Sequence, residues 1–385
     1  MTKRKVCVVV TARPSYARIK TVLVAINNHP NLELQLVLAG SVLLDKYGSA
    51  VDVIENDGFK IVDKIYNVLD GHSPTTMAKT TGLAIMELAS TFSNLKPNVV
   101  VTIADRFETL ATSIAASYQN IPLAHIQGGE VTGNIDEKVR HANTKLADIH
   151  FVSSDDARQR VLKMGEEDCM IFNTGCPSID IAREVLESPG FDFDPLVKYG
   201  GVGDEINWKK GYLVVLQHPV TTEFEKSREQ INATLNAIHE MNIPTFWFWP
   251  NVDAGSDGTS KGLRVFRERH QESNIHFFIN MEPQDFLKLI KNSRCIVGNS
   301  SVGIRESSFL AVPAVNIGTR QNKRLRGKNI IDCGNKKEEI IESIQKHITI
   351  GNFESEFIYG DGYAGQKIAN LLASCDLKFH KVITY

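Results

Sequence analysis

The 385-residue chain lacks the features typical of membrane, nucleic-acid-binding and secreted proteins. No apolar run approaches the 18 residues of a membrane-spanning helix, and the N-terminus leads into a strand-length run, unlike a signal peptide. The formal net charge of −2 gives no basic excess for nucleic acid, although it leaves room for a local cationic pocket. We therefore expect a cytoplasmic protein that binds neither nucleic acid nor membrane.

Signatures of metal and common cofactor sites are also missing. The six cysteines form no C-x-x-C pair, and several stand in or beside apolar runs, as buried reduced thiols do. No His/Cys/Asp spacing matches a zinc site, and neither a P-loop nor a G-x-S-x-G elbow is present. The glycine fingerprint G-x-G-x-x-G is absent as well. We therefore expect no metal and no covalent serine mechanism.

The chain does contain short apolar runs that alternate with amphipathic helical patterns, which predicts right-handed βαβ units and parallel sheets. Its 42% hydrophobic and 23% charged residues are those of a globular protein. Strands are expected at Val6–Val10, Leu34–Leu38, Val99–Ile103, Leu123–Ile126, Ile149–Val152, Met170–Phe172, Leu213–Leu216, Thr245–Phe248, His276–Ile279, Cys295–Val297 and Ala314–Ile317. Helices are expected at Thr75–Leu95, Phe107–Tyr118 and Asp155–Met164, from Pro283, near Val302, and from Tyr359 to about Ala373.

The alternation breaks between residues 187 and 210, a stretch rich in Gly, Pro and Asp that is typical of a linker. Because the chain is too long for one ordinary core, we expect an α/β protein with two Rossmann-like domains facing a central cleft. Residues 1–186 would form the first domain and residues 211–362 the second. Residues 363–385 would form a C-terminal helix and tail that could pack back on the first domain.

Charged residues gather where two N-terminal apolar runs end. The first run ends at Asp105. The second ends in a segment that contains His125, Gln127 and Glu130. The carboxyl ends of buried parallel strands open onto the crevice where α/β folds bind ligands. A single carboxylate there would be an ordinary loop charge, whereas a cluster predicts proton-transfer chemistry. The full cluster comprises Asp105, Glu130, Asp136, Glu137, Arg140 and His141.

Two other segments are candidates for binding phosphate. Arg13 lies in a polar turn directly after the first strand, where backbone N–H groups and the guanidinium could hold an anion. Ser300 and Ser301 begin an expected helix, where small hydroxyl residues can contact phosphate oxygens. Glu306, one turn later, could bond ribose hydroxyls. The alternatives are a solvated Arg and an ordinary helix cap.

His218 and Arg320 also follow expected strands. His218 stands between Gln217 and Pro219 with hydroxyl residues next door, which favours a catalytic or phosphate-binding role over the structural role usual for a lone His. Arg320 could bind phosphate. It also belongs to a basic cluster that could be a solvated loop: Arg320, Lys323, Arg324, Arg326 and Lys328.

Several motifs, in order along nearly the whole chain, resemble the UDP-N-acetylglucosamine 2-epimerases. The similarity is greatest to the hydrolysing branch of the sialic acid pathway, which includes the epimerase domain of the animal bifunctional epimerase/kinase. The motifs are Ala104-Asp-Arg106, His125-Ile-Gln-Gly-Gly-Glu-Val-Thr-Gly133, Arg140-His-Ala142, Gly175-Cys-Pro-Ser178, Gln217-His-Pro-Val-Thr-Thr222, Pro250-Asn-Val-Asp-Ala-Gly255, Gly298-Asn-Ser-Ser-Val-Gly-Ile-Arg-Glu306, Gly318-Thr-Arg-Gln321 and Tyr359-Gly-Asp-Gly362.

The resemblance implies a glycosyltransferase-B-like fold with a UDP-sugar in the cleft, and neither metal nor nicotinamide cofactor. The first domain would be the sugar side and the second the nucleotide side. Carried over by motif, the catalytic groups would be Asp105, Asp136 and His218. The nucleotide would be held by Arg13, Ser300, Ser301, Glu306 and Arg320. Further substrate contacts would come from the motif residues Arg106, Arg140, His141 and Asn251.

One position departs from the family pattern. Where the animal enzyme and the non-hydrolysing branch place a catalytic Glu, this chain has Gln127. A neutral amide cannot act as a base, so either Glu130, Asp136 or His218 takes over the proton transfer, or the substrate differs. Relatives that act on nucleotide-linked diacetamido-6-deoxy sugars belong to the same branch, which supports the second alternative.

The reaction implied is an anti elimination from UDP-N-acetylglucosamine, followed by hydration to UDP and N-acetylmannosamine. In the α-linked chair the C1 oxygen and the C2 hydrogen are both axial and anti. Carboxylates near the ring and cations at the diphosphate would match the charges that develop. The alternatives are a UDP- or GDP-linked diacetamido-6-deoxy sugar as substrate, a glycosyltransferase, and a nucleotide-sugar sensor. We expect a homo-oligomer, either a dimer or a tetramer.

Overall fold

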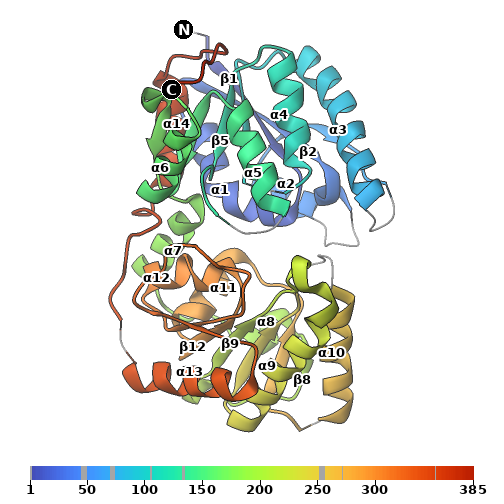
Figure 1. Ribbon diagram of the computed structural model, residues 1–385, viewed down its shortest axis with the longest axis vertical. Helices are drawn as coiled ribbons and strands as arrows, with labels where there is room; N and C mark the ends of the chain where they lie inside the picture. The colour runs from blue at the N-terminus through green and yellow to red at the C-terminus, as the bar shows by residue number, and fades with distance from the viewer. Residues whose placement is uncertain are drawn as a thin grey trace. The chain divides into compact units, whose positions relative to one another are not determined.

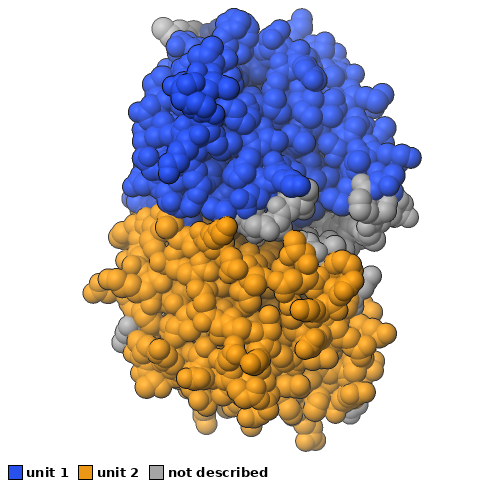
Figure 2. Space-filling model, viewed as in Figure 1, with its two compact units in different colours: residues 1–131, 135–180, 359–385 blue, residues 132–134, 181–358 orange. Residues whose placement is uncertain are grey.

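The computed structural model describes residues 2–44, 50–69, 74–104, 106–131, 135–250, 256–270, 272–351 and 353–385. Two compact units make up the chain (Figure 2). Unit 1 contains residues 1–131, 135–180 and 359–385, and unit 2 contains residues 132–134 and 181–358. Within the described ranges, no helix is long and apolar enough to cross a membrane.

Unit 1 is built on a seven-stranded sheet of order β3-β2-β1-β4-β5-β6-β7, in which every neighbouring pair is parallel (Figure 1). The strands are β1 (Arg4–Val10), β2 (Leu32–Ala39), β3 (Ile61–Ile65), β4 (Val99–Ile103), β5 (Leu123–Ile126), β6 (Ile149–Val152) and β7 (Ile171–Asn173). The helices are α1 (Arg13–Asn28), α2 (Ala50–Asn56), α3 (Pro74–Leu95), α4 (Thr109–Tyr118), α5 (Ile135–Leu146), α6 (Asp155–Lys163), α7 (Pro177–Glu187, which runs into unit 2) and α14 (Ala364–Ser374).

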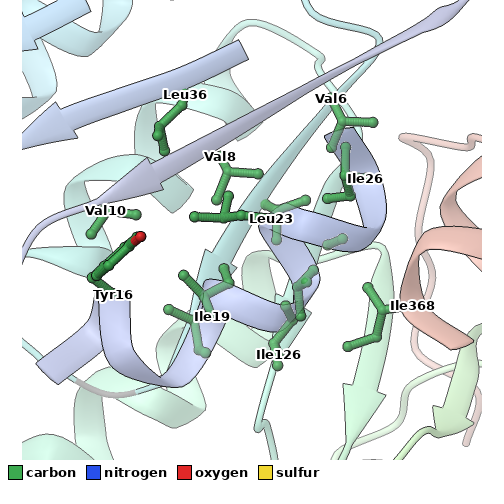
Figure 3. Packing of buried hydrophobic residues seen from close by; sticks show 14 of the residues in the cluster. Val6, Val8, Val10, Tyr16, Ile19, Leu23, Ile26, Leu36, Ile126 and Ile368 are labelled. Atoms are coloured by element: carbon green, nitrogen blue, oxygen red, sulfur yellow. The ribbon is translucent and has the colours of Figure 1, made fainter. Parts of the chain in front are cut away.

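The side chains of β1 alternate between two separate cores, because successive residues of a strand point to opposite faces. Val6, Val8 and Val10 pack with α1 and with Ile368 of α14 (Figure 3). Cys7 and Val9 pack on the other face with residues of α3 and α4. Both faces of the sheet are therefore covered, which explains why β1 reads as an unbroken apolar run.

Unit 2 repeats this plan with strand order β14-β13-β12-β9-β10-β11-β8. Its strands are β8 (Val202–Gly203), β9 (Leu213–Leu216), β10 (Thr245–Phe248), β11 (Ile275–Phe278), β12 (Cys295–Gly298), β13 (Ala314–Ile317) and β14 (Ile330–Cys333). Its helices are α8 (Pro195–Tyr199), α9 (Ser227–Met241), α10 (Ser256–Arg269), α11 (Pro283–Lys291), α12 (Glu306–Leu310) and α13 (Lys337–Ile350), and a 3-10 turn, η6 (Ser301–Gly303), precedes α12. All neighbouring strands are parallel except β8, which is antiparallel to β11.

Residues 187–210, expected to be a linker, belong to unit 2. They contribute α8 and the edge strand β8. His276 of β11 fastens this segment, because its ring nitrogens lie 3.1 Å from Asp204 O and 2.8 Å from Gly200 O. The composition of this segment, on which the linker prediction rested, gives no indication of these contacts.

The C-terminal segment lies in unit 1. Helix α14 packs on α1, and Gly365 allows the close approach, since a Cβ there would lie 2.7 Å from Thr21 O. Asp180 of α7 accepts hydrogen bonds from Ala364 N (2.8 Å) and Gly365 N (2.7 Å) at the start of α14. This capping holds the returning chain against unit 1.

Candidate functional site

In each sheet the strand order reverses between two strands, and doubly wound folds bind ligands at the carboxyl ends beside such a point. In unit 1 the reversal lies between β1 and β4, and in unit 2 between β9 and β12. The sequence-predicted residues Arg13, Arg106, His218, Ser300 and Ser301 all lie within a few residues of these four strand ends.

The turn after β1 presents an uncapped helix N-terminus. Arg13 is the first residue of α1, and Ala12 at the N-cap offers no side-chain oxygen. Ser15 N and Tyr16 N both donate to Ala12 O, at 3.0 and 3.1 Å. Arg13 is half-buried. This arrangement suits an anion, because a helix start concentrates backbone donors and a partial positive charge.

The end of β4 is held in an unusual backbone conformation. Ala104 has a φ of 63°, and its carbonyl oxygen lies 3.0 Å from His125 Nε2. Arg106 follows, and its guanidinium contacts the buried Glu108 at 3.3 and 3.4 Å. Asp105, the predicted catalytic carboxylate between them, lies outside the described residues. A non-glycine residue at positive φ is uncommon and is often found at functional sites.

Gln127, at the end of β5, shares this backbone strain, with a φ of 65°. It is buried, and its Nε2 donates to Cys176 Sγ at 2.9 Å. Cys176 Sγ in turn lies 3.0 Å from Ser178 Oγ. The Gln127 amide is therefore oriented by the Gly175-Cys-Pro-Ser178 motif. The motif is visible in the sequence, but a role for Cys176 could not be predicted from it.

Glu130 and Arg140 are buried together after β5. Arg140 Nη1 donates to Glu130 O at 3.0 Å, and Ser153 Oγ donates to Glu130 Oε1 at 2.9 Å. Asp136 lies in the first turn of α5 and is half-buried. His141 Nε2 is 3.5 Å from Glu137 Oε1 one turn earlier. Helix α5 thus carries four members of the predicted cluster, and Arg140 in its second turn joins the helix to the loop after β5.

His218 follows β9 and is enclosed by the loop after β12. Its backbone N–H donates to Asn299 Oδ1 at 2.7 Å, and Asn299 Nδ2 donates to His218 O at 2.8 Å. Burial, and then the positive charge of Arg320, hold the pKa of His218 well below its usual range. His218 is therefore neutral at physiological pH, the protonation state that a general base requires.

Arg320 is placed by the same asparagine. Arg320 Nη1 and Gln321 Nε2 both donate to Asn299 O, at 3.2 and 2.8 Å. Asn299 therefore connects His218 with the loop after β13. The basic residue Arg326 braces this loop, because its Nη2 donates to Gln321 O at 2.9 Å and its Nε pairs with Asp332 at 2.6 Å. Asn299 and Gln321 lie within motifs of the sequence, but their roles could not be predicted, because amide residues in loops carry no distinctive signal.

Ser300 and Ser301 occupy the end of β12, but the helix there differs from the expected one. Ser300 Oγ accepts from Val302 N at 3.4 Å, and Ser301 Oγ accepts from Arg305 Nη2 at 3.0 Å. A 3-10 turn comes first, and α12 begins only at Glu306 and spans five residues. Anion binding would therefore depend on the hydroxyl, N–H and Arg305 groups more than on a helix dipole.

The end of β12 approaches β9 very closely. Gly298 has a φ of 134°, and a Cβ at this position would collide with the backbone of Leu216. A cavity in unit 2 is lined by Leu216, Gly298, Ser300 and Gly303. Glu306 is buried nearby in the chain, with Oε2 3.8 Å from Arg305 Nε. Asn251, predicted to contact substrate, lies outside the described residues.

Two Rossmann-like units with these strand orders define a protein of the glycosyltransferase-B-like class. The family model described as "UDP-N-acetylglucosamine 2-epimerase" matches residues 24–373. The chain therefore belongs to the UDP-N-acetylglucosamine 2-epimerase family, which confirms the resemblance seen in the motifs.

Individual relatives support this assignment. The chain is 30% identical, over 97% of each chain, to UDP-N,N'-diacetylbacillosamine 2-epimerase (hydrolyzing) from Legionella pneumophila. It is 29% identical to UDP-N-acetylglucosamine 2-epimerase from Neisseria meningitidis, over 94% of this chain and 91% of the relative. The fold matches the Methanocaldococcus jannaschii UDP-GlcNAc 2-epimerase in complex with UDP-GlcNAc and UDP, with a TM-score of 0.77, 19% identity and coverage of 96% and 99%.

Proposed function

We propose that this protein is a hydrolysing 2-epimerase, which converts a UDP-linked 2-acetamido sugar into UDP and the free sugar epimerised at C2. The observation that carries the proposal is the buried, neutral His218 beside Arg320 at the end of β9. A neutral imidazole can take up a proton, and a guanidinium beside it favours an anionic ligand. Few binding-only sites need that combination.

The chemistry consists of two steps. In the first, a base removes the C2 proton while the bond between C1 and the diphosphate oxygen breaks, which gives UDP and an unsaturated 2-acetamidoglycal. In the second, water adds its hydroxyl to C1. C2 takes up a proton on the face opposite to the one from which the first proton was removed. We assign the proton transfers to Asp105, Asp136 and His218, with Glu130 as a further candidate, and the orientation of the sugar or of water to Gln127.

The nucleotide side of the proposal rests on unit 2. Ser300, Ser301, Arg320 and backbone N–H groups would hold the diphosphate, and the buried Glu306 would accept from the ribose. Anion recognition by N–H groups, hydroxyls and a guanidinium requires no metal ion. In unit 1, Arg13 and Arg106 would supply further cations, and Arg140, His141 and Asn251 would contact substrate.

Two sugars are candidates for the substrate. The name of the Legionella relative favours UDP-N,N'-diacetylbacillosamine, and the name of the Neisseria relative favours UDP-N-acetylglucosamine. Gln127 is a departure from the catalytic Glu of the animal enzyme, and this supports the diacetamido sugar as the better substrate.

The test is a product assay with both sugar nucleotides, in EDTA and without an acceptor. We expect free UDP and a free 2-epimer, with deuterium at C2 when the reaction runs in D₂O. An intact UDP-linked 2-epimer would contradict the hydrolysing assignment. Turnover only with an added acceptor would indicate a glycosyltransferase, and binding without turnover would indicate a sensor.

A further inference from the structure

Helix α5 needs hydrogen-bond donors from outside the helix at its C-terminal end, because the last four carbonyls of an α-helix have no amide partner within it. Ala147 N continues the ladder by one step and donates to Asn143 O at 2.9 Å. The next amide, Asp148 N, leaves the ladder and donates to Leu123 O at 2.8 Å. Thr144 and Ala147 are buried, so water has little access and their carbonyl oxygens must find donors in the protein.

Lys381, in the C-terminal tail, supplies these donors. Its ammonium Nζ donates to Ala147 O at 2.6 Å, to Lys145 O at 2.8 Å and to Thr144 O at 3.4 Å. A cation at the C-terminal end of a helix also interacts favourably with the helix dipole. Lys381 therefore caps α5, although it lies 234 residues beyond Ala147 in the chain.

A buried carboxylate, Glu166, holds the ammonium in place. Its Oε2 lies 2.5 Å from Lys381 Nζ and 3.0 Å from His150 Nε2, and its Oε1 lies 2.6 Å from Lys145 Nζ. Burial raises the pKa of Glu166, but hydrogen bonds from these three donors outweigh burial and lower the pKa to about 2. Glu166 is therefore ionised at neutral pH, and it joins the tail to β6 and to the last turn of α5.

The rest of the tail buries little surface. Residues 376–385 form neither helix nor strand, and all of them are exposed except Leu377 and Lys381. Besides the contacts of Lys381, Thr384 N donates to Gly165 O, in the loop after α6, at 3.3 Å. A segment with so little apolar burial depends on polar contacts for its conformation. The position of the tail and the cap on α5 are therefore one and the same interaction.

We propose that Lys381 is a positioning residue of the candidate active site, because its cap on α5 fixes the side chains that this helix presents. Asp136 lies in the first turn of α5, and Arg140 and His141 lie in the second. A helix of 12 residues moves as one rigid element, so a loose C-terminal end also displaces Asp136 at the other end. The kinetic consequence rests on the proposed function, in which Asp136 transfers a proton. A catalytic group displaced by about 1 Å can lower kcat by about 10².

The experiment combines amide hydrogen exchange with steady-state kinetics on variants of the full chain. Lys381→Met keeps the length of the side chain and removes the ammonium, so amides in the last two turns of α5 should exchange at least about tenfold faster. The kcat for the sugar nucleotide should fall by at least about threefold. Calorimetric UDP affinity should stay within about twofold of the wild type, because the groups proposed to hold the diphosphate lie in unit 2.

Two further variants make the comparison specific. Lys381→Arg keeps a cation whose N–H groups can bond the same carbonyls, so its exchange rates and its kcat should lie closer to the wild type than those of Lys381→Met. Lys378→Met is the matched control, because it removes an exposed ammonium from the same tail. This control should change neither the exchange of α5 nor kcat.

Wild-type exchange of α5 in Lys381→Met would overturn the proposal. So would faster exchange with an unchanged kcat, since Lys381 would then stabilise the helix without positioning the site. An Arg variant no better than the Met variant would count against a cap made by a cation. Hydrogen exchange does not depend on turnover, so a wild-type chain that turns over neither sugar nucleotide would contradict the proposed function, while the exchange rates would still decide whether Lys381 caps α5.

Discussion

The ends of β5 and β9 hold their candidate groups by different means. At the end of β5, Gln127 contacts a thiol sulfur, and Glu130 is bonded by a serine hydroxyl and lies beside Arg140. At the end of β9, His218 is held through its backbone by Asn299, and Arg320 is the charge that acts on it. The first setting keeps an amide and a carboxylate in place, and the second keeps an imidazole neutral beside a cation.

This difference bears on the protonation state of the His218 imidazole. A buried imidazole next to a guanidinium stays unprotonated. The β9 setting thus combines a base with affinity for an anion. The β5 setting positions an amide and a carboxylate, with the Arg140 guanidinium bonded to the Glu130 backbone carbonyl.

Loss of the imidazole should have the largest effect. His218→Ala should lower kcat by about 10²–10⁴, the range for removing a general acid or base. Steady-state turnover of the sugar nucleotide gives kcat, and calorimetric UDP affinity reports whether the site stays folded. His239→Ala, an exposed histidine on α9, is the matched control. A near-normal kcat for His218→Ala would show that the end of β9 takes no part in proton transfer.

A negative charge placed next to His218 should shift the pH dependence of kcat. Because its pKa lies well below the usual range, the acid limb of kcat should fall below pH 6.5 in the wild type. Asn299→Asp puts a carboxylate against His218 and removes the donor to its carbonyl. A nearby negative charge favours the imidazolium, so the acid limb should shift to higher pH. An unshifted limb would mean that another group titrates there.

The same depressed pKa has a consequence for stability. Above pH 6.5, the ordinary pKa of histidine in an unfolded chain, His218 is neutral in both the folded and the unfolded protein. Its protonation then makes no contribution to the free energy of unfolding. As the pH falls below 6.5, only the unfolded chain gains the proton, so this group lowers the free energy of unfolding until its folded pKa is reached. Urea titrations of wild type and His218→Gln should therefore differ in slope against pH in that window. Parallel slopes would contradict the neutral assignment.

Removing one hydroxyl from the end of β12 should have a moderate effect. Ser301→Ala should weaken UDP binding by about 1–3 kcal/mol, the value of a hydrogen bond to a charged oxygen. Calorimetry measures the change directly. Ser293→Ala removes a hydroxyl that bonds Ile290 O at the end of α11 and should leave UDP affinity unaffected. Equal affinities for wild type and Ser301→Ala would place the diphosphate elsewhere.

The smallest effect should come from the amide at the end of β5. Gln127→Glu should alter kcat by no more than about tenfold, since one exchanged hydrogen bond is worth about 0.5–1.5 kcal/mol. The variant keeps the size of the side chain beside Cys176. Gln366→Glu, exposed on α14, controls for added charge. Complete loss of activity would make Gln127 essential and weaken the role given to His218.

The buried strands were predictable from sequence because both faces of each sheet are covered. β4, β5, β6, β9, β10 and β13 have the predicted bounds, and each is an apolar or nearly apolar run. β3 (Ile-Val-Asp-Lys-Ile) and β14 (Ile-Ile-Asp-Cys) were missed. Both lie at sheet edges, where one side of the strand is less buried and polar residues interrupt the run.

The positions of the candidate residues on the fold could be predicted from the sequence, but the contacts between them could not. Strand ends are marked by the abrupt change from apolar to polar residues, which placed Gln127, His218 and Ser300 correctly beside β5, β9 and β12. The contacts of Gln127 with Cys176 and of His218 with Asn299 join residues 49 and 81 positions apart. Such pairings depend on how strands are ordered, and no local pattern records them.

The contact between Gly175 and Gly360 has a consequence for how the protein can be taken apart. A Cβ on Gly175 would lie 2.9 Å from Gly360 Cα, and Cys176 N donates to Tyr359 O at 2.8 Å. The chain thus leaves unit 1 and returns to it at almost the same point. In these terms the stretch between Asp180 and Tyr359 is an insertion within unit 1, and a linker that replaces it must keep Asp180, because this residue caps α14.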